Sequence, residues 1–294
     1  MNFCSSGDAG EQLFFVSGNV AYCYDFETHI LAPVVQGASF GGFIDSYFVV
    51  LDASESTLKV SESFDGFTWD PTQVYQRSRA GDKWLSMAVT SNNIWLIGTQ
   101  TGEVWVGTGN AENRFAPYAP VFIEMGVLAA NTMIRVSGDT MMWVAQDKDG
   151  AGYVVQTNGY TPQKVSTAAV DTSIQNLSVT GDGSAFSYQQ EGHTFYVVSF
   201  PTAQTTWVYD LSTHEWHRRG YWDRNQMKLP GLPAAVPRVR VRGGVWLRPE
   251  PRRRSRERPD RGDPLPLRPR YGRRVHPPRA AMPASRAARR GNDV

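Results

Sequence analysis

The sequence predicts an all-β fold, a β-propeller-like array of antiparallel hairpins, and two observations support this prediction. Segments rich in β-branched and aromatic residues alternate with turn residues along most of the chain. A hairpin-like unit also recurs, with starts roughly 35 to 50 residues apart, which is the spacing of propeller blades. A single small sheet of this kind cannot bury both of its faces, so we expect neighbouring units to pack against one another.

The clearest unit spans residues 194–216, with the sequence TFYVVSFPTAQTTWVYDLSTHEW. Residues 195–198 and 207–209 read as two strands, and Pro201 and Thr202 lie in the loop that joins them. The chain then turns through residues 210–214, and Glu215 begins a third strand. Four further segments share this layout; they start at Gln12, Ser46, Ile94 and Met141.

The individual segments give more specific expectations. Gly18 and Asn19 form a tight hairpin turn, because both residues tolerate positive φ. The apolar run 47–51 predicts a strand that is buried on both faces, whereas the alternation in residues 57–61 predicts a half-exposed strand.

The segment SFDGFTW contains the most patterned turn, and its structural residues are Ser63, Asp65, Gly66 and Trp69. The carboxylate is expected to accept backbone N–H groups within the turn, the glycine to adopt the strained φ, and the indole to pack back on the hairpin. The segment is similar to the Asp-box turn of sialidase-type propellers, although it is one residue shorter. Such turns stabilise the fold and do not catalyse reactions.

Three other segments interrupt the strand pattern. Residues 71–88 are expected to form a helical or irregular insert, and residues 107–132 to be loop-like. Residues 166–178 are expected to contain a short helix that Ser166 or Thr167 caps.

Charge is divided unevenly between two parts of the chain, residues 1–228 and residues 229–294. The first part holds 12 Lys and Arg and 23 Asp and Glu, whereas the second holds 18 Arg, no Lys, 5 acids and 12 of the 18 prolines. Proline at this density opposes helices and central strands, so we expect residues 229–294 to be disordered or poorly packed. Two interpretations remain open: an out-of-frame translation product of a GC-rich gene, or an arginine-rich arm that binds nucleic acid.

The residues that carry chemistry are sparse. Cys4 and Cys23 cannot form a metal site alone, and no histidine spacing supplies the missing ligands. The sequence contains no nucleophile-elbow, phosphate-loop or dinucleotide-binding motif, no secretory signal and no apolar run long enough to span a membrane. We therefore expect no enzymatic activity, no cofactor and no metal.

Several segments together resemble a known phage family: GGFIDSYFVVLD, SESFDGFTWDP, WLIGTQTGEVW, GYTPQKVSTAAVD and GHTFYVVSFPTAQTTWVYDLSTHEWHRRG. The resemblance is to the packaged-DNA stabilisation proteins, the tail-hub or tail-factor proteins of short-tailed bacteriophages, and it covers most of residues 3–224. It implies a propeller-like virion protein, assembled in the cytoplasm of the bacterial host. The protein would lie below the portal and adaptor rings, plug the portal channel, and stabilise the packaged DNA. The implied partners are the portal or adaptor, the tail needle or spike proteins, and further copies of the chain in a ring.

The chain departs from the family pattern at both ends, since family members have a segment before the first strands and continue as β-structure after residue 228. We therefore expect an incomplete propeller with exposed sheet edges. The candidate partner contacts are Arg218, Arg219, Tyr221 and Trp222, although Trp222 has the alternative role of covering the end of the last blade.

Two other functions remain as alternatives. One is a sialidase-like propeller that binds or hydrolyses glycans, which requires several arginines to converge in a central cavity. The other is nucleic-acid binding through the arginine-rich tail, which deletion of residues 229–294 would abolish.

Overall fold

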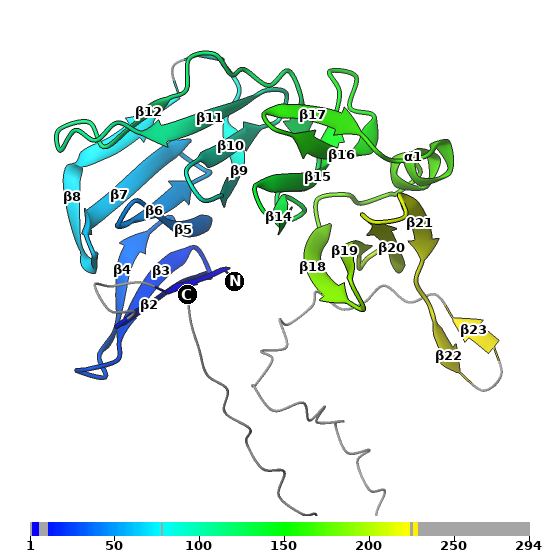
Figure 1. Ribbon diagram of the computed structural model, residues 1–294, viewed down its shortest axis with the longest axis horizontal. Coiled ribbons are helices and arrows are strands. Elements are labelled where there is room, and N and C mark those ends of the chain that lie inside the picture. Colours follow the sequence, from blue (N-terminus) through cyan, green and yellow to red (C-terminus); the bar gives the residue numbers. More distant parts are fainter. Residues whose placement is uncertain (1, 6–10, 78, 224–225, 229–294) are drawn as a thin grey trace, which may run out of the picture. The chain divides into compact units, whose positions relative to one another are not determined.

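The computed structural model describes residues 2–5, 11–77, 79–223 and 226–228, and it confirms the all-β, propeller-like prediction. Five antiparallel sheets follow one another along the chain, and they are called the first to fifth sheets here (Figure 1). Residues 229–294, for which the sequence predicts disorder, lie outside the described residues.

The first sheet pairs its strands in sequence order: β1 (Asn2–Ser5), β2 (Gln12–Ser17), β3 (Val20–Asp25) and β4 (Leu31–Gln36). Gly18 and Asn19 join β2 to β3 with φ of 60° and 62°, so the predicted tight turn is confirmed. Cys4 and Cys23 both lie opposite Phe14, on strands to either side of β2. Two strand spacings separate their Cα atoms by roughly 10 Å, which is too far for a disulfide.

The second sheet contains β5 (Phe40–Ile44), β6 (Tyr47–Asp52), β7 (Thr57–Ser63) and β8 (Asp65–Gln76). The strand at residues 47–51 is buried on both faces, as its apolar run predicts. The half-exposed strand predicted at residues 57–61 is more buried than expected, because Thr57 and Ser61 are also covered. The irregular insert predicted at residues 71–88 is wrong, because residues 71–76 continue β8 at the sheet edge, where Pro71 is tolerated.

The third sheet contains β9 (Trp84–Val89), β10 (Ile94–Gly98), β11 (Gly102–Gly107) and β12 (Phe115–Pro117). Two short strands replace part of the loop expected at residues 107–132: β12 at this sheet's edge, and β13 (Gly126–Val127) in the next sheet.

The fourth sheet pairs β13 with β15 (Thr140–Gln146), followed by β16 (Gly152–Asn158) and β17 (Thr161–Lys164), while β14 (Ile134–Ser137) also pairs with β15. The predicted helix follows as α1 (Ala168–Gln175). Thr167 is its N-cap residue, but the Thr167 side chain makes no capping hydrogen bond. Among the described residues, no helix is long and apolar enough to cross a membrane.

The fifth sheet contains β18 (Ser184–Gln190), β19 (His193–Phe200), β20 (Thr205–Asp210) and β21 (Glu215–Arg218). The strands predicted at residues 195–198 and 207–209, and the third beginning at Glu215, are thus all present. A two-stranded ribbon of β22 (Tyr221–Asp223) and β23 (Gln226–Lys228) follows.

Four apolar clusters join successive sheets, so the sheets bury one another's faces as predicted. In β10, Ile94 and Leu96 pack in the cluster with the second sheet, whereas Trp95 and Ile97 pack in the cluster with the fourth. This division follows from the two-residue repeat of a strand. Among the described residues, no such cluster joins the first sheet to the fifth, and the propeller is not closed.

Candidate interaction surfaces

The patterned turn at residues 63–69 ties the second sheet to the first. The Asp65 carboxylate accepts the backbone N–H of Phe67 at 2.9 Å, and the Trp69 indole donates to the Gly66 carbonyl at 2.8 Å. The Gly66 N–H in turn donates at 2.8 Å to the side-chain carbonyl of Gln12, on the first sheet. These bonds satisfy the polar groups of the turn and leave no convergent set for catalysis.

The reason for glycine in this turn differs from the prediction. The left-handed residue is Phe64, with φ of 56°, and the expectation that Gly66 takes the strained φ is wrong. A Cβ atom at Gly66 would lie 2.8 Å from Cys23 Sγ and 3.2 Å from the Phe48 ring. Close packing between two sheets therefore requires the glycine. Ser63 lies opposite Tyr47 at the end of β7.

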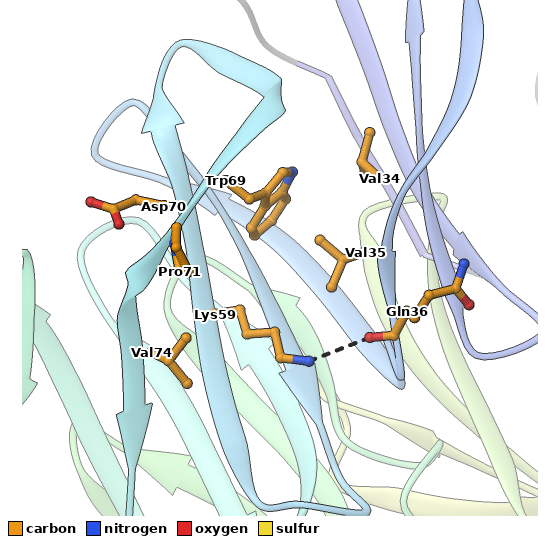
Figure 2. Close-up of a pocket in the computed structure, with 8 residues that line it drawn as sticks. All are labelled: Val34, Val35, Gln36, Lys59, Trp69, Asp70, Pro71 and Val74. Atoms are coloured by element: carbon orange, nitrogen blue, oxygen red, sulfur yellow. Dashed lines mark hydrogen bonds between the residues drawn. The ribbon is translucent and has the colours of Figure 1, made fainter.

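A shallow groove of about 380 Å³ lies beside this turn, between edge strand β4 and strands β7 and β8 (Figure 2). Its walls are mainly apolar; the lining residues are Val34, Val35, Gln36, Lys59, Trp69, Asp70, Pro71 and Val74. The Lys59 ammonium bonds to the Gln36 carbonyl at 3.4 Å and to the Asp52 carboxylate at 3.3 Å, while the Asp70 carboxylate accepts two bonds from Thr72. The charged side chains of the groove, Lys59 and Asp70, are thus engaged with the protein itself.

A buried ion cluster joins the second and third sheets, and the sequence analysis did not identify it. Arg77, at the end of the second sheet, bonds to Glu103 on β11 at 3.3 Å and to Asp82 at 3.0 Å. The Glu103 side chain is fully buried, and the Arg77 side chain is 4% exposed. Glu103 also accepts the Trp105 indole N–H at 3.1 Å.

The Asp82 carboxylate in this cluster is held ionised. Its burial opposes ionisation, but hydrogen bonds from Gln100 and Thr101 and the charge of Arg77 outweigh the burial and lower the pKa of Asp82. The cluster is satisfied internally, which is typical of a structural rather than a substrate-binding site.

The other described arginines of the first four sheets are also engaged singly. Arg114 pairs with Glu62 at 2.9 Å, Arg135 pairs with Asp139 at 3.6 Å, and Arg79 donates to two backbone carbonyls. Their guanidinium groups do not share one pocket, so the described residues lack the arginine cluster that a sialidase-like site requires.

The candidate contact residues Arg218 and Arg219 are both exposed, at the end of the fifth sheet. The Arg219 guanidinium lies 5.8 Å from the centre of the Tyr188 ring and bonds to the Tyr188 hydroxyl. Arg218 lies 6.0 Å from the Trp207 ring. The backbones of Tyr221 and Trp222 lie in β22, but their side chains are outside the described residues, so the two roles considered for Trp222 stay open.

An aromatic row continues from Tyr188 across the outer face of the fifth sheet. Tyr188 stacks on Phe195 at 4.9 Å, and Phe195 stacks on His193 at 5.9 Å. His193 Nδ1 lies 2.7 Å from the Asp210 carboxylate. Burial opposes ionisation of Asp210, but hydrogen bonds from Ser212 and His193 outweigh it and lower the pKa of Asp210.

The first and fifth sheets share a turn of sequence Tyr-Asp-x-x-Thr-His, which begins at Tyr24 and at Tyr209. In each turn the tyrosine hydroxyl bonds to histidine Nδ1: Tyr24 to His29 at 3.0 Å, and Tyr209 to His214 at 2.9 Å. The two histidines have φ of 58° and 60°. The same six-residue turn is therefore built twice, and its histidines are used structurally.

Metal binding and thiol chemistry find no support among the described residues, which contain no group of three potential metal ligands. Burial raises the pKa of the Cys23 thiol to about 12, with the negative charge of Asp65 adding to the effect. At neutral pH this thiol is protonated and unreactive.

A family model described as the phage stabilisation family, "Bacteriophage P22 Gp10, beta-propeller", matches residues 12–232. The chain belongs to this phage stabilisation family. The resemblance drawn from the sequence is thereby confirmed, and with it a structural role in a bacteriophage. Membership in the stabilisation family also indicates a virion protein. No curated protein matches the chain.

Solved structures similar to this member of the stabilisation family have low sequence identity. The N-terminal domain of Nup159 is 9% identical with a TM-score of 0.44; the similarity covers 81% of this chain and 65% of that one. U3-55K is 11% identical with a TM-score of 0.47, covering 77% and 67% of the two chains. Kluyveromyces lactis Hsv2 is 12% identical with a TM-score of 0.39, covering 72% and 61%. The chain thus spans less than two thirds of the Nup159 domain.

Proposed function

We propose that this protein is a tail-hub component that plugs the portal channel and stabilises the packaged DNA. The observation that carries the proposal is the family match over residues 12–232, which include all five sheets except β1. The proposed partners are the portal or adaptor above and the tail needle or spikes below, with several copies forming a ring.

The charge of the body is consistent with a passive plug. Residues 1–228 contain 23 acids and 12 Lys and Arg, and the arginines in the first four sheets are bound within the protein. A surface of this kind repels phosphates, so DNA would pass it without being held.

Deleting the gene from its phage tests this function directly. We expect the mutant to package DNA and then lose it, so purified heads would be mostly empty and their DNA sensitive to nuclease. Supplying the wild-type chain in trans should restore nuclease-protected DNA. Mutant particles that retain their DNA as well as wild-type particles would refute the proposal.

A gel-retardation experiment tests the passive role separately. Residues 1–228, expressed without the arginine-rich segment, should not retard duplex DNA at low salt, whereas tight retardation would contradict the passive role. Comparison with the full chain would show whether residues 229–294 bind DNA by themselves, as the nucleic-acid alternative requires.

A further inference from the structure

The groove beside the patterned turn lies where the outermost strands of two sheets meet. β4 ends the first sheet and β8 ends the second, so each strand has one edge without a neighbouring strand in its own sheet. Figure 2 shows Val34 and Val35 on one wall of the groove, and Trp69, Pro71 and Val74 on the other. A ligand in this groove would therefore contact side chains from both sheets.

Both walls depart from regular strand pairing. In β4 the register shifts at Val34, which has no partner in β3, and the residue before it is Pro33. In β8, residues 70–73 have no partner in β7, and Pro71 is one of them. Bulges and prolines at a sheet edge oppose the addition of a further strand. We therefore expect a ligand to bind through its side chains and not by extending either sheet.

The apolar side chains of the groove are held in place before any ligand binds. The Trp69 indole donates to the Gly66 carbonyl at 2.8 Å, and its ring centre lies 5.8 Å from that of Phe14 in the core. Pro71 is exposed and Val74 is 39% exposed, so both offer apolar surface on the same wall. Grooves lined in this way by an aromatic ring and apolar side chains bind proline-rich segments.

A polyproline II segment fits a groove whose edges oppose strand addition. Its backbone makes no internal hydrogen bonds and stays solvated, so it does not need the unpaired groups of a regular edge strand. Its conformation is also largely formed before binding, which reduces the entropy lost on docking. The side chains of the segment are then free to pack on the wall of the groove.

The charges of the groove and of its first wall favour a basic ligand. Residues 11–58, which include all of β4, contain six acids and no lysine or arginine. Asp70 lines the groove, and hydrogen bonds from Thr72 lower the pKa of Asp70, so its carboxylate is ionised at neutral pH. The nearby cations Lys59 and Arg114 are each paired with a carboxylate of the protein, at 3.3 and 2.9 Å.

Asp70 also retains an atom that can bind a ligand. Among the described residues, both bonds to its carboxylate come from Thr72 and reach Oδ1. Oδ2 can therefore accept a charge-assisted hydrogen bond from an arginine or lysine.

We propose that this groove binds a proline-rich segment of another polypeptide that carries arginine or lysine beside its prolines. The proline rings pack on Trp69, Pro71 and Val74, and a basic side chain pairs with Asp70. The backbone of the segment adds no strand to either sheet. This proposal does not depend on the tail-hub function.

The test measures binding of a synthetic peptide to the full-length chain by fluorescence anisotropy. The probe is Pro-Pro-Leu-Pro-Pro-Arg-Pro-Arg with fluorescein at its N-terminus. We expect saturable 1:1 binding with a Kd of about 1–100 µM.

Protein variants locate the binding site. Val74→Arg places bulk and positive charge in the groove and should weaken binding about tenfold or more. Asp70→Asn should weaken it about two- to fivefold, as expected for the loss of one exposed charge pair. Val179→Arg is the matched control and should bind as the wild type does, because Val179 is 42% exposed but lies in the loop before the fifth sheet. Circular dichroism should show that all three variants remain folded.

Peptide variants test the chemistry of the ligand. Replacing both arginines with glutamate should weaken binding about tenfold or more, because Asp70 would then face a like charge. Replacing every proline with alanine keeps the charge but removes the preformed conformation, and it should also weaken binding about tenfold or more. A strand-forming peptide, Thr-Val-Thr-Val-Thr-Arg-Val-Arg, should bind more weakly than the probe.

Four results would overturn the proposal. One is the absence of saturable binding up to about 1 mM peptide, as expected if another segment of the chain covers the groove. The second is equal affinity of Val74→Arg and Val179→Arg, since the peptide would then bind elsewhere. The third is unchanged affinity of the alanine peptide, which would mean that charge alone drives binding. The fourth is tighter binding of the strand-forming peptide, which would indicate strand addition.

Discussion

Replacing Arg77 with methionine tests whether the buried ion cluster holds the second and third sheets together. Methionine retains much of the side-chain volume but removes the charge, which leaves the fully buried Glu103 carboxylate and the 13%-exposed Asp82 carboxylate without their cation. Removing one partner of a buried ion pair typically costs about 3–5 kcal/mol. We expect the free energy of unfolding to fall by about that amount.

Urea denaturation followed by tryptophan fluorescence measures this change, because Trp105 lies in the cluster and bonds to Glu103. Arg135→Met is the matched control: Arg135 and its partner Asp139 are 44% and 55% exposed, so its loss should cost less than about 1 kcal/mol. Adding Glu103→Gln to Arg77→Met should recover part of the loss, because the uncompensated charge is removed. A loss below about 1 kcal/mol for Arg77→Met would refute the assigned role of the cluster.

Three further predictions concern the turn at Gly66, the loss of stability at acid pH, and the Cys23 thiol. Gly66→Ala should destabilise the fold by about 1–3 kcal/mol, because the new methyl group would overlap Cys23 and Phe48; an unchanged melting temperature would contradict the close packing. The pKa of Asp82 is lower in the folded state than in the unfolded state. The ionised carboxylate therefore contributes its full stabilisation of the fold above the pKa of an unfolded aspartate, and this contribution is lost as the pH falls through the folded pKa. The unfolding free energy should therefore decline below about pH 4, and less steeply in Asp82→Asn; equal slopes would show that this carboxylate does not contribute. In a Cys4→Ser background, Cys23 should react with a thiol reagent at pH 8 only after denaturant is added, whereas rapid labelling of the native protein would show that the thiol is accessible.

The strands were predictable where the local pattern alone determines the structure. The uninterrupted apolar run at residues 47–51 identified a strand with two buried faces, and the Gly18-Asn19 pair identified a hairpin turn. The blade-like spacing predicted that the sheets would cover one another, and the four inter-sheet clusters show it. For the strand and the turn, the signal lies within a few residues of the feature that it predicts.

The errors arose where distant residues decide the outcome. An insert was expected at residues 71–88, but Pro71 continues a strand at a sheet edge, where its missing N–H costs no hydrogen bond. Gly66 suggested a strained φ. The position requires glycine instead because Cys23, on the first sheet, approaches it closely. The Arg77–Glu103 pair joins residues 26 positions apart, and nothing in one sequence indicates that two such residues will meet.

The internal repetition of the turn that begins at Tyr24 and Tyr209 has a consequence for how such a chain can change. The first, second, third and fifth sheets are local four-stranded meanders, and among the described residues the apolar clusters join each sheet only to the sheets beside it. One unit can therefore be inserted or removed without rebuilding the rest. Inserting or removing a unit brings the same two kinds of sheet face together at the new junction, since each unit packs one face on the unit before it and the other face on the unit after it. A tandem copying of gene segments would thus lengthen the array while leaving its two ends able to meet the same kinds of neighbour.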